Sequence, residues 1–137
     1  MPRIARLPVM PAVHPALAYV VGFVVLVLVS GTAARAQDAS AGRDVFQSQC
    51  GICHSPQPGR NIVGPSLFGV VGRHSGRIAG FHYSAANLRS GITWDPPTLD
   101  RYLASPQQVV PGTAMTYPGL PDPRKRANLL AFLETLH

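Results

Sequence analysis

The sequence predicts an all-α fold, with about four short helices and long loops wrapped around a large internal ligand. No run in the chain of 137 residues shows the alternating pattern of a strand. Stretches rich in glycine and proline fill 55–80 and 105–121. Loops of this length are uncommon in a compact domain unless something holds them, and so small a domain lacks enough core on its own. These features together predict a bound group inside the fold.

The first 36 residues have the pattern of a secretory signal peptide. Arg3 and Arg6 precede an apolar run at 16–29, and small residues then lead to Ala34-Arg35-Ala36. We expect cleavage after Ala36, export to the periplasm, and a mature domain of 37–137. The alternative is an uncleaved membrane anchor, but a run of about 14 apolar residues is short against the roughly 20 that a spanning helix needs.

Four helices are expected in the mature domain from their caps and apolar spacing. Each follows a side chain that can accept hydrogen bonds from free N–H groups, and two have proline in the first turn. The expected segments are roughly 39–50 after Asp38 or Ser40, from 85 to a stop near Ser90-Gly91 after Ser84, 96–104 after Asp95, and 123 to the C-terminus after Asp122. The last carries an apolar stripe of Leu129, Leu130, Leu133 and Leu136.

The charge of the chain argues against a nucleic-acid partner. The sequence has 12 Lys and Arg against 6 Asp and Glu. Arg3, Arg6 and Arg35 belong to the leader, which has no acid, so the mature domain keeps nine cations and six anions, a net charge of +3. A nucleic-acid binder would show a denser basic stripe with aromatic residues within it.

The segment Cys50-Gly51-Ile52-Cys53-His54 supplies the expected ligand. Two thiols at this spacing can bond to the two vinyl groups along one edge of a haem, and the adjacent imidazole then lies under the iron as an axial ligand. A zinc site needs a second pair of ligands, and the chain has no third cysteine. A thioredoxin-type pair needs a βαβ context, and a disulfide across so short a loop would stabilise little. The motif predicts one covalent haem c, an iron cofactor, on Cys50 and Cys53, with His54 as a ligand.

The sixth iron ligand distinguishes a carrier from a catalyst. An open position favours binding or chemistry on small molecules, whereas two protein ligands favour electron transfer. The candidates are Met115, His74, His82 and His137. We favour Met115 because it follows the turn-rich run Pro111-Gly112-Thr113-Ala114 and is the only methionine of the mature domain. The alternative is that Met115 fills the core, as most methionines do.

The mature chain resembles the class I cytochromes c, the small single-haem proteins that include mitochondrial cytochrome c and its soluble bacterial relatives. The resemblance covers about 40–136 and consists of many short segments in the same order. These segments are Gly42 to Phe46, Cys50 to His54, Gly64 to Gly69, Gly72-Arg73, Tyr83 to Asn87, Gly91 to Trp94, Tyr102-Leu103, Pro111 to Met115 and Leu129 to Leu133.

The resemblance implies roles for individual residues. It implies His54 and Met115 as axial ligands, with the carbonyl of Pro65 accepting the N–H of His54. It implies that the first and last helices cross near Gly42, close to Leu129 and Phe132. The residues implied at the haem propionates are Arg73, Tyr83, Trp94, Ser84 and Thr113, and those in the polar network beside the haem are Asn87 and Tyr102.

The expected function is one-electron transfer, and the protein is not expected to be an enzyme. We expect a monomer that shuttles between a quinol-oxidising complex and a terminal oxidase or reductase, docking transiently with membrane or periplasmic redox proteins. One alternative is an electron-accepting subunit dedicated to a periplasmic dehydrogenase, and another is a ligand-binding haem protein with an open iron. Direct membrane association is expected only if the leader is retained.

The chain departs from the mitochondrial proteins of this family in one respect that concerns docking. Those proteins have lysines around the exposed haem edge, whereas this chain has Ala114 beside Met115 and Lys125 as the only lysine of the mature domain. A strongly basic docking face is therefore not expected.

Overall fold

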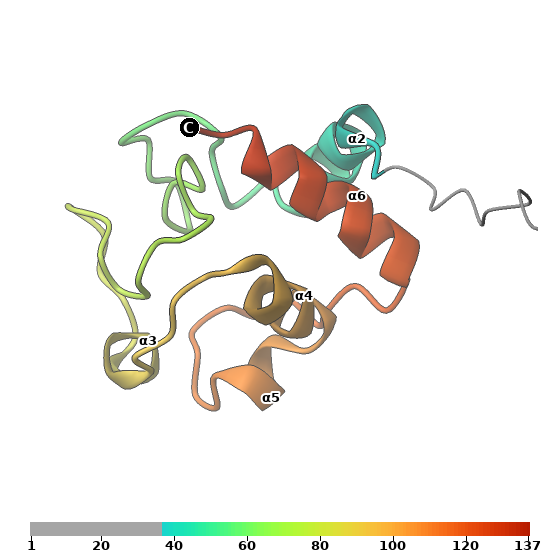
Figure 1. The fold of residues 1–137 in the computed structure, drawn as a ribbon. Coiled ribbons are helices and arrows are strands. Elements are labelled where there is room, and N and C mark those ends of the chain that lie inside the picture. Colours follow the sequence, from blue (N-terminus) through green and yellow to red (C-terminus); the bar gives the residue numbers. More distant parts are fainter. Residues whose placement is uncertain (1–36) are drawn as a thin grey trace, which may run out of the picture. The chain divides into compact units, whose positions relative to one another are not determined.

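The structure, a computed structural model, describes residues 37–137, which form five helices joined by long loops (Figure 1). The helices are α2 (Ala39–Gln49), α3 (Ala85–Arg89), α4 (Pro96–Ala104), α5 (Pro106–Val109) and α6 (Pro123–Glu134). Residues 37–137 contain no strand beyond two isolated bridges, His54 with Asn61 and His74 with Thr93. This confirms the all-α class. The predicted leader and its cleavage site lie outside the described residues, and none of the described helices is long and apolar enough to cross a membrane.

Aspartate and serine caps begin four of the helices, as the sequence predicts. The carboxylate of Asp38 accepts from the N–H groups of Ser40 and Ala41, so Asp38 rather than Ser40 is the cap of α2. The caps of α3, α4 and α6 are Ser84, Asp95 and Asp122. Each oxygen satisfies N–H groups that have no partner inside the first helical turn.

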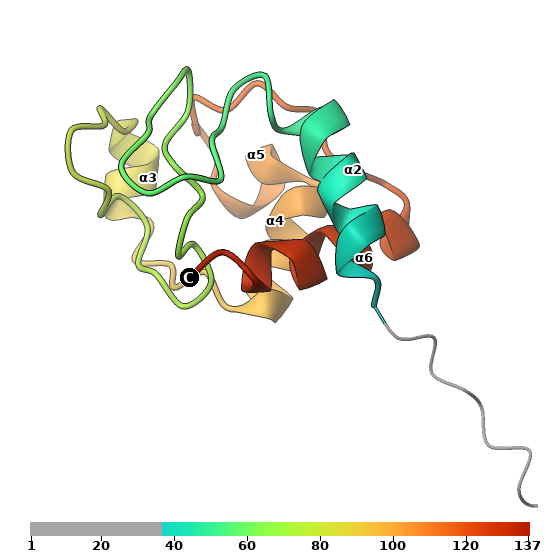
Figure 2. The same cartoon turned by 90° about the horizontal axis from the view of Figure 1, so that it is seen from above.

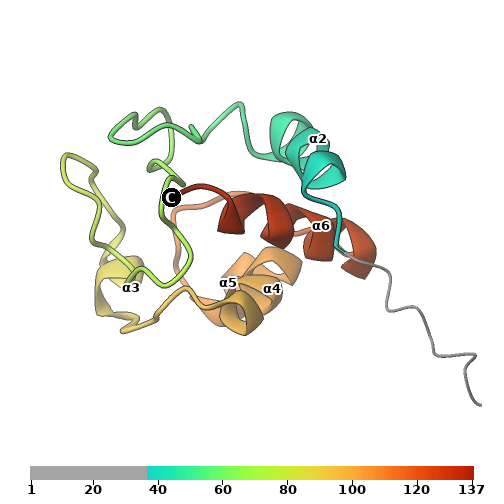
Figure 3. The same cartoon turned by 45° about the horizontal axis from the view of Figure 1, so that its top comes forward.

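Helix α6 lies between α2 and α4, as Figures 1 and 3 show. The crossing with α2 occurs at Gly42, as predicted, because a Cβ atom there would overlap the carbonyl of Asn128 and lie 2.9 Å from the Cβ of Phe132. The backbone nearest to Gly42 is that of Asn128, one residue before the predicted Leu129. Beside the crossing, the rings of Phe46 and Phe132 pack with centroids 5.3 Å apart. Only glycine permits so close an approach.

Two features of the C-terminal half differ from the prediction. The stretch 105–121 was expected to be loop throughout, but it contains α5, which begins at Pro106 after Ser105. Helix α6 was expected to reach the C-terminus, but it ends at Glu134. Leu136 lies beyond it, and its carbonyl accepts from the N–H of Gly69 in the long loop. The chain end therefore turns away from the helix axis to hold that loop.

The loop 55–80 passes along one side of the helices, with α3 at its far end (Figure 2). It is held by its own polar groups. The side chain of Asn61 accepts from the N–H of Ser66 at 3.0 Å and donates to the carbonyl of Ala79 at 3.3 Å. Ser66 is fully buried and donates to the carbonyl of Gln57 at 2.6 Å. These bonds give an irregular segment a fixed course around the space beside the helices.

Candidate functional site

A cavity of about 450 Å³ lies between the helices and the long loops, within the size range of ligand pockets. Cys50, Cys53, His54 and Met115 all line it. His54 of the motif and Met115, the predicted sixth ligand, are 61 positions apart in the sequence, yet they line the same cavity. The apolar walls are formed by Leu67, Val70, Trp94, Leu99, Leu103 and Leu133.

The two cysteines lie on the turn that ends α2. The N–H groups of Cys53 and His54 both donate to the carbonyl of Cys50, at 3.0 and 2.9 Å. This turn directs all three side chains of the motif to the cavity. Both thiols are free, and burial raises the pKa of Cys50 to about 11. A thioether, which has no charged form, suits such an apolar position.

A hydrogen bond at Nδ1 fixes the orientation of the His54 ring. Its Nδ1 lies 2.8 Å from the carbonyl oxygen of Pro65. A carbonyl can only accept, so Nδ1 carries the proton and Nε2 keeps a free lone pair. Burial lowers the pKa of His54, which favours the neutral ring. Gly64 makes room for it, because a Cβ atom at that position would overlap the ring.

A hydrogen-bonded chain of side chains leads to the sulfur of Met115. Asn87 Oδ1 accepts from Ser84 at 2.8 Å and from Thr113 at 2.9 Å. The Tyr102 hydroxyl lies 3.2 Å from Thr113 Oγ1 and 3.4 Å from Met115 Sδ. Since Thr113 gives its single proton to Asn87, the proton of Tyr102 points toward Thr113 or the sulfur. The predicted polar network is thus brought together in the structure.

Gln107 is a residue that the sequence prediction missed. Its side-chain nitrogen donates to the carbonyls of Thr113 and Met115, at 3.1 and 3.2 Å, and so fixes the loop that carries the methionine. Gln107 lies on α5, the helix that was also missed. Ser105 makes no side-chain cap hydrogen bond, but Pro106 stands in the first turn as proline does in α4 and α6, and that proline could have identified both.

Arg73, Tyr83 and Trp94 line the same cavity. The Arg73 guanidinium is half-buried and donates to the carbonyls of Phe68 and Ser66, at 2.9 and 3.1 Å. Burial lowers its pKa, but guanidinium stays charged in proteins. In residues 37–137 no carboxylate pairs with Arg73. A half-buried cation without an acid beside an apolar cavity fits a ligand that carries carboxylates of its own, as haem does.

Of the three other candidates for the sixth ligand, His82 lines the cavity, whereas His74 and His137 do not. His74 is exposed and contacts the hydroxyl of Thr93 at 3.0 Å, and His137 is exposed and contacts the carbonyl of Glu134. Neither lines the cavity. His82 does line it, at an exposed position. Met115 and His82 are therefore the candidates that the geometry retains.

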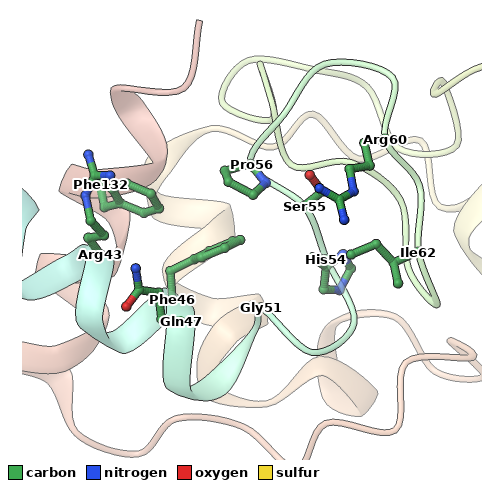
Figure 4. Close-up of a pocket in the computed structure, with 10 residues that line it drawn as sticks. All are labelled: Arg43, Phe46, Gln47, Gly51, His54, Ser55, Pro56, Arg60, Ile62 and Phe132. Atoms are coloured by element: carbon green, nitrogen blue, oxygen red, sulfur yellow. The ribbon is translucent and has the colours of Figure 1, made fainter.

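A second, smaller cavity of about 340 Å³ lies beyond His54 (Figure 4). Arg43 and Arg60 lie on opposite sides of it, and Phe46 and Phe132 contribute to its wall. It contains neither thiol and no methionine. The groups that could hold a covalent haem thus converge only on the larger cavity among the described residues.

The chain is similar to several known proteins over most of its length. It is 56% identical over 99 residues to a cytochrome c2 of Rhodopila globiformis, which covers 72% of this chain and 93% of that protein. It is 50% identical over 99 residues to a cytochrome c2 of Rhodoblastus acidophilus, covering 72% and 92%. The solved structure of cytochrome cH from Methylobacterium extorquens matches with a TM-score of 0.68 and 43% identity, covering 72% of this chain and 98% of that one. No protein-family model matches the chain.

Proposed function

This chain belongs to the class I cytochromes c, and on that premise we propose that it shuttles single electrons in the periplasm between a quinol–cytochrome c reductase and a terminal oxidase or reductase. Membership of the family makes it a single-haem electron carrier rather than an enzyme. The observation that carries the proposal is the convergence of both thiols, His54 and Met115 on one apolar cavity.

Each residue of the site has a proposed role. Cys50 and Cys53 would hold the haem covalently, and the haem would supply an iron that changes oxidation state by one electron. His54 would offer Nε2 and Met115 would offer Sδ to the iron. Because two protein ligands leave no open position, the site favours electron transfer over binding of small molecules.

The surrounding side chains adjust the potential and the geometry. The thioether of Met115 favours ferrous iron, and the apolar walls disfavour the extra charge of ferric iron, so both raise the potential. The carbonyl of Pro65 keeps the His54 ring in one orientation and one tautomer. Arg73, Tyr83 and Trp94, with Ser84 and Thr113, would bind the propionates, and Asn87 and Tyr102 would complete the polar network.

We propose that 1–36 is removed as a signal peptide and that 37–137 is the mature domain. The basic start, the short apolar run and the small residues before position 37 support this. The mass and the N-terminal sequence of the protein isolated from the periplasm test it. A protein found in membranes with its leader intact would contradict it.

Turnover with isolated quinol–cytochrome c reductase and with oxidase-containing membranes tests the shuttle. We expect reduction by the first and oxidation by the second. The alternative is a subunit dedicated to one periplasmic dehydrogenase, which would co-purify with that enzyme and react poorly with the oxidase. That result would overturn the proposed pathway while leaving the electron-carrier function in place.

A further inference from the structure

The cavity opens to solvent through a ring of side chains that we call the mouth. It comprises the cavity-lining residues that are exposed: Gln49, Ile52, Val63, His82, Ala114, Thr116 and Pro118. None of them is Lys, Arg, Asp or Glu. The only Lys, Arg, Asp or Glu on the cavity wall is Arg73, and its guanidinium is directed to the carbonyls of Phe68 and Ser66.

The mouth also carries the two most exposed large apolar side chains of the described residues. Ile52 is 82% exposed and Val63 is 73% exposed. Their segments run side by side, because the N–H of Gly64 donates to the carbonyl of Cys53 at 2.8 Å and His54 bridges to Asn61. Single exposed apolar residues are ordinary, but a pair gathered at the opening of a ligand cavity is typical of an interaction site.

Neutral contacts, rather than ionic ones, connect the two sides of the mouth. The hydroxyl of Tyr117 donates to the side-chain oxygen of Gln49 at 3.3 Å, which ties the loop after Met115 to the end of α2. Several cations of the domain are engaged elsewhere. Arg126 pairs with Asp100 at 2.7 Å, Arg43 lies over the ring of Phe132, and Arg60 donates to Gln57.

We propose that the mouth docks a redox protein whose own contact face is uncharged and apolar. This inference rests on the proposed shuttle function and names the chemistry of its partner. Acidic side chains on a partner would find no Lys or Arg at this opening to pair with, and they would lose their hydration on docking. An apolar face would remove Ile52 and Val63 from water, which is favourable at roughly 25 cal/mol for each Å² of apolar surface.

The proposal predicts how association depends on salt. Without charge pairs at the contact, steering is weak and the association rate should lie in the unsteered range of about 10⁵–10⁷ M⁻¹s⁻¹. Added salt therefore has little electrostatic attraction to screen, and the rate should depend only weakly on ionic strength. An acidic partner docking on a basic ring would instead lose about tenfold or more as salt rises.

The test uses the haem-loaded mature protein and membranes of the organism that encodes it. The second-order rate constant for its oxidation and reduction is measured from about 10 to 500 mM ionic strength, and we expect a change of less than about threefold. Ile52→Ser combined with Val63→Ser should lower the rate about tenfold at every ionic strength, with an unchanged midpoint potential. Leu88→Ser is the matched control, because Leu88 is 59% exposed on α3 and does not line the cavity, and it should leave the rate unchanged.

The variant Ala114→Lys provides a second, independent test of the docking proposal. A lysine at the mouth would have to be desolvated against an apolar partner, so we expect a lower rate at every ionic strength. Three outcomes would each overturn the docking proposal. They are a higher rate for Ala114→Lys than for the wild type at low salt, a steep fall of the wild-type rate with salt, and an unchanged rate in the variant with Ile52 and Val63 replaced. No turnover with the membranes at any ionic strength would instead overturn the shuttle function itself.

Discussion

Gln107 and Met115 are joined by a hydrogen bond, with the side-chain nitrogen of Gln107 donating to the main-chain carbonyl of Met115 at 3.2 Å. The same nitrogen donates to the carbonyl of Thr113. Main-chain anchoring on both sides of Ala114 limits how far the sulfur can move. The helix α5, although only four residues long, thereby positions the proposed sixth ligand.

Replacing Gln107 with alanine should loosen the proposed methionine ligand. We expect the free energy of unfolding to fall by about 1 kcal/mol, since net hydrogen bonds contribute about that much. Added imidazole should also displace Met115 several-fold more readily, as measured by visible spectroscopy. Gln108→Ala is the matched control, because Gln108 is exposed on the same helix and its side chain makes no hydrogen bond within residues 37–137. Equal imidazole affinity in both variants would show that Gln107 does not hold the loop.

Met115→Ala should lower the midpoint potential markedly while the haem stays attached. The reason is that removal of the thioether removes the ligand that favours ferrous iron. Redox titration measures the potential, and binding of carbon monoxide to the ferrous protein reports an opened position. His82→Ala is the control, because His82 is the other candidate that lines the cavity. If His82→Ala shifted the potential and Met115→Ala did not, histidine would be the ligand.

Replacing Cys50 and Cys53 together with alanine should yield protein from which acidified solvent extracts the haem. Loss of both thioethers leaves only ligand bonds and non-covalent contacts to hold it. The wild-type protein should retain its haem under the same treatment. Haem that stays with the double variant after extraction would mean that another residue attaches it.

Gly64→Ala and Gly42→Ala should both destabilise the protein, with different effects on the potential. At each position an added Cβ atom would overlap its neighbours, and overpacking costs about 1–3 kcal/mol. At Gly42 the neighbours belong to α6, so only the free energy of unfolding should change. At Gly64 the neighbour is the ring of His54, so the potential should change as well. A Gly64 variant with an unaltered potential would argue against His54 as an axial ligand.

Stability should decline in acid as the helix caps become protonated. The pKa of Asp38 is lowered mainly by its hydrogen bond from Ser40, that of Asp95 by its bonds with Thr98, and that of Asp122 chiefly by the N–H of Lys125. A folded-state pKa below the unfolded value means that the caps stabilise fully above the unfolded pKa, near 3.9, and lose this contribution as the pH falls through the folded pKa.

Asparagine tests these caps because it accepts the same hydrogen bonds without titrating. We expect Asp95→Asn combined with Asp122→Asn to flatten the dependence of stability on pH between about pH 5 and 2.5, as measured by denaturant midpoints. Asp44→Asn, at an exposed position of α2 away from the cap, should leave the dependence as it is in the wild type. An unchanged slope in the cap variant would mean that other carboxyl groups govern acid unfolding.

Local sequence signals predicted most of the helices. The aspartates before α2, α4 and α6 and the serine before α3 act on the next few residues, so their effect can be read without knowing the fold. Helix α5 follows a serine as well, but the Ser105 side chain makes no cap hydrogen bond, and four residues are too few to form an apolar stripe. The end of α6 depends on Leu136 turning to hold the loop at Gly69, a contact that no local pattern encodes.

The haem motif was readable because its three residues are neighbours in the chain, whereas the remainder of the site is not local. Gln107 donates to main-chain carbonyls, and because every residue has one, such a bond cannot be predicted from residue types. The buried Ser66 and its partner Asn61 hold a loop whose course depends on contacts distant in sequence. The uncharged mouth is likewise formed by residues that are distant in sequence and that only the fold places around one opening: Gln49, Ile52, Val63, His82, Ala114, Thr116 and Pro118.

The crossing of α2 and α6 has a consequence for the order in which the protein assembles. The N–H of Asp38 donates to the side chain of Asn128, 90 residues away, and Gly42 packs on the same part of α6. This contact is therefore among the most distant in sequence within residues 37–137, and closing so long a loop carries a large entropic cost and slows folding. A chain that emerges from its N-terminal side cannot complete this pairing until 123–134 has followed.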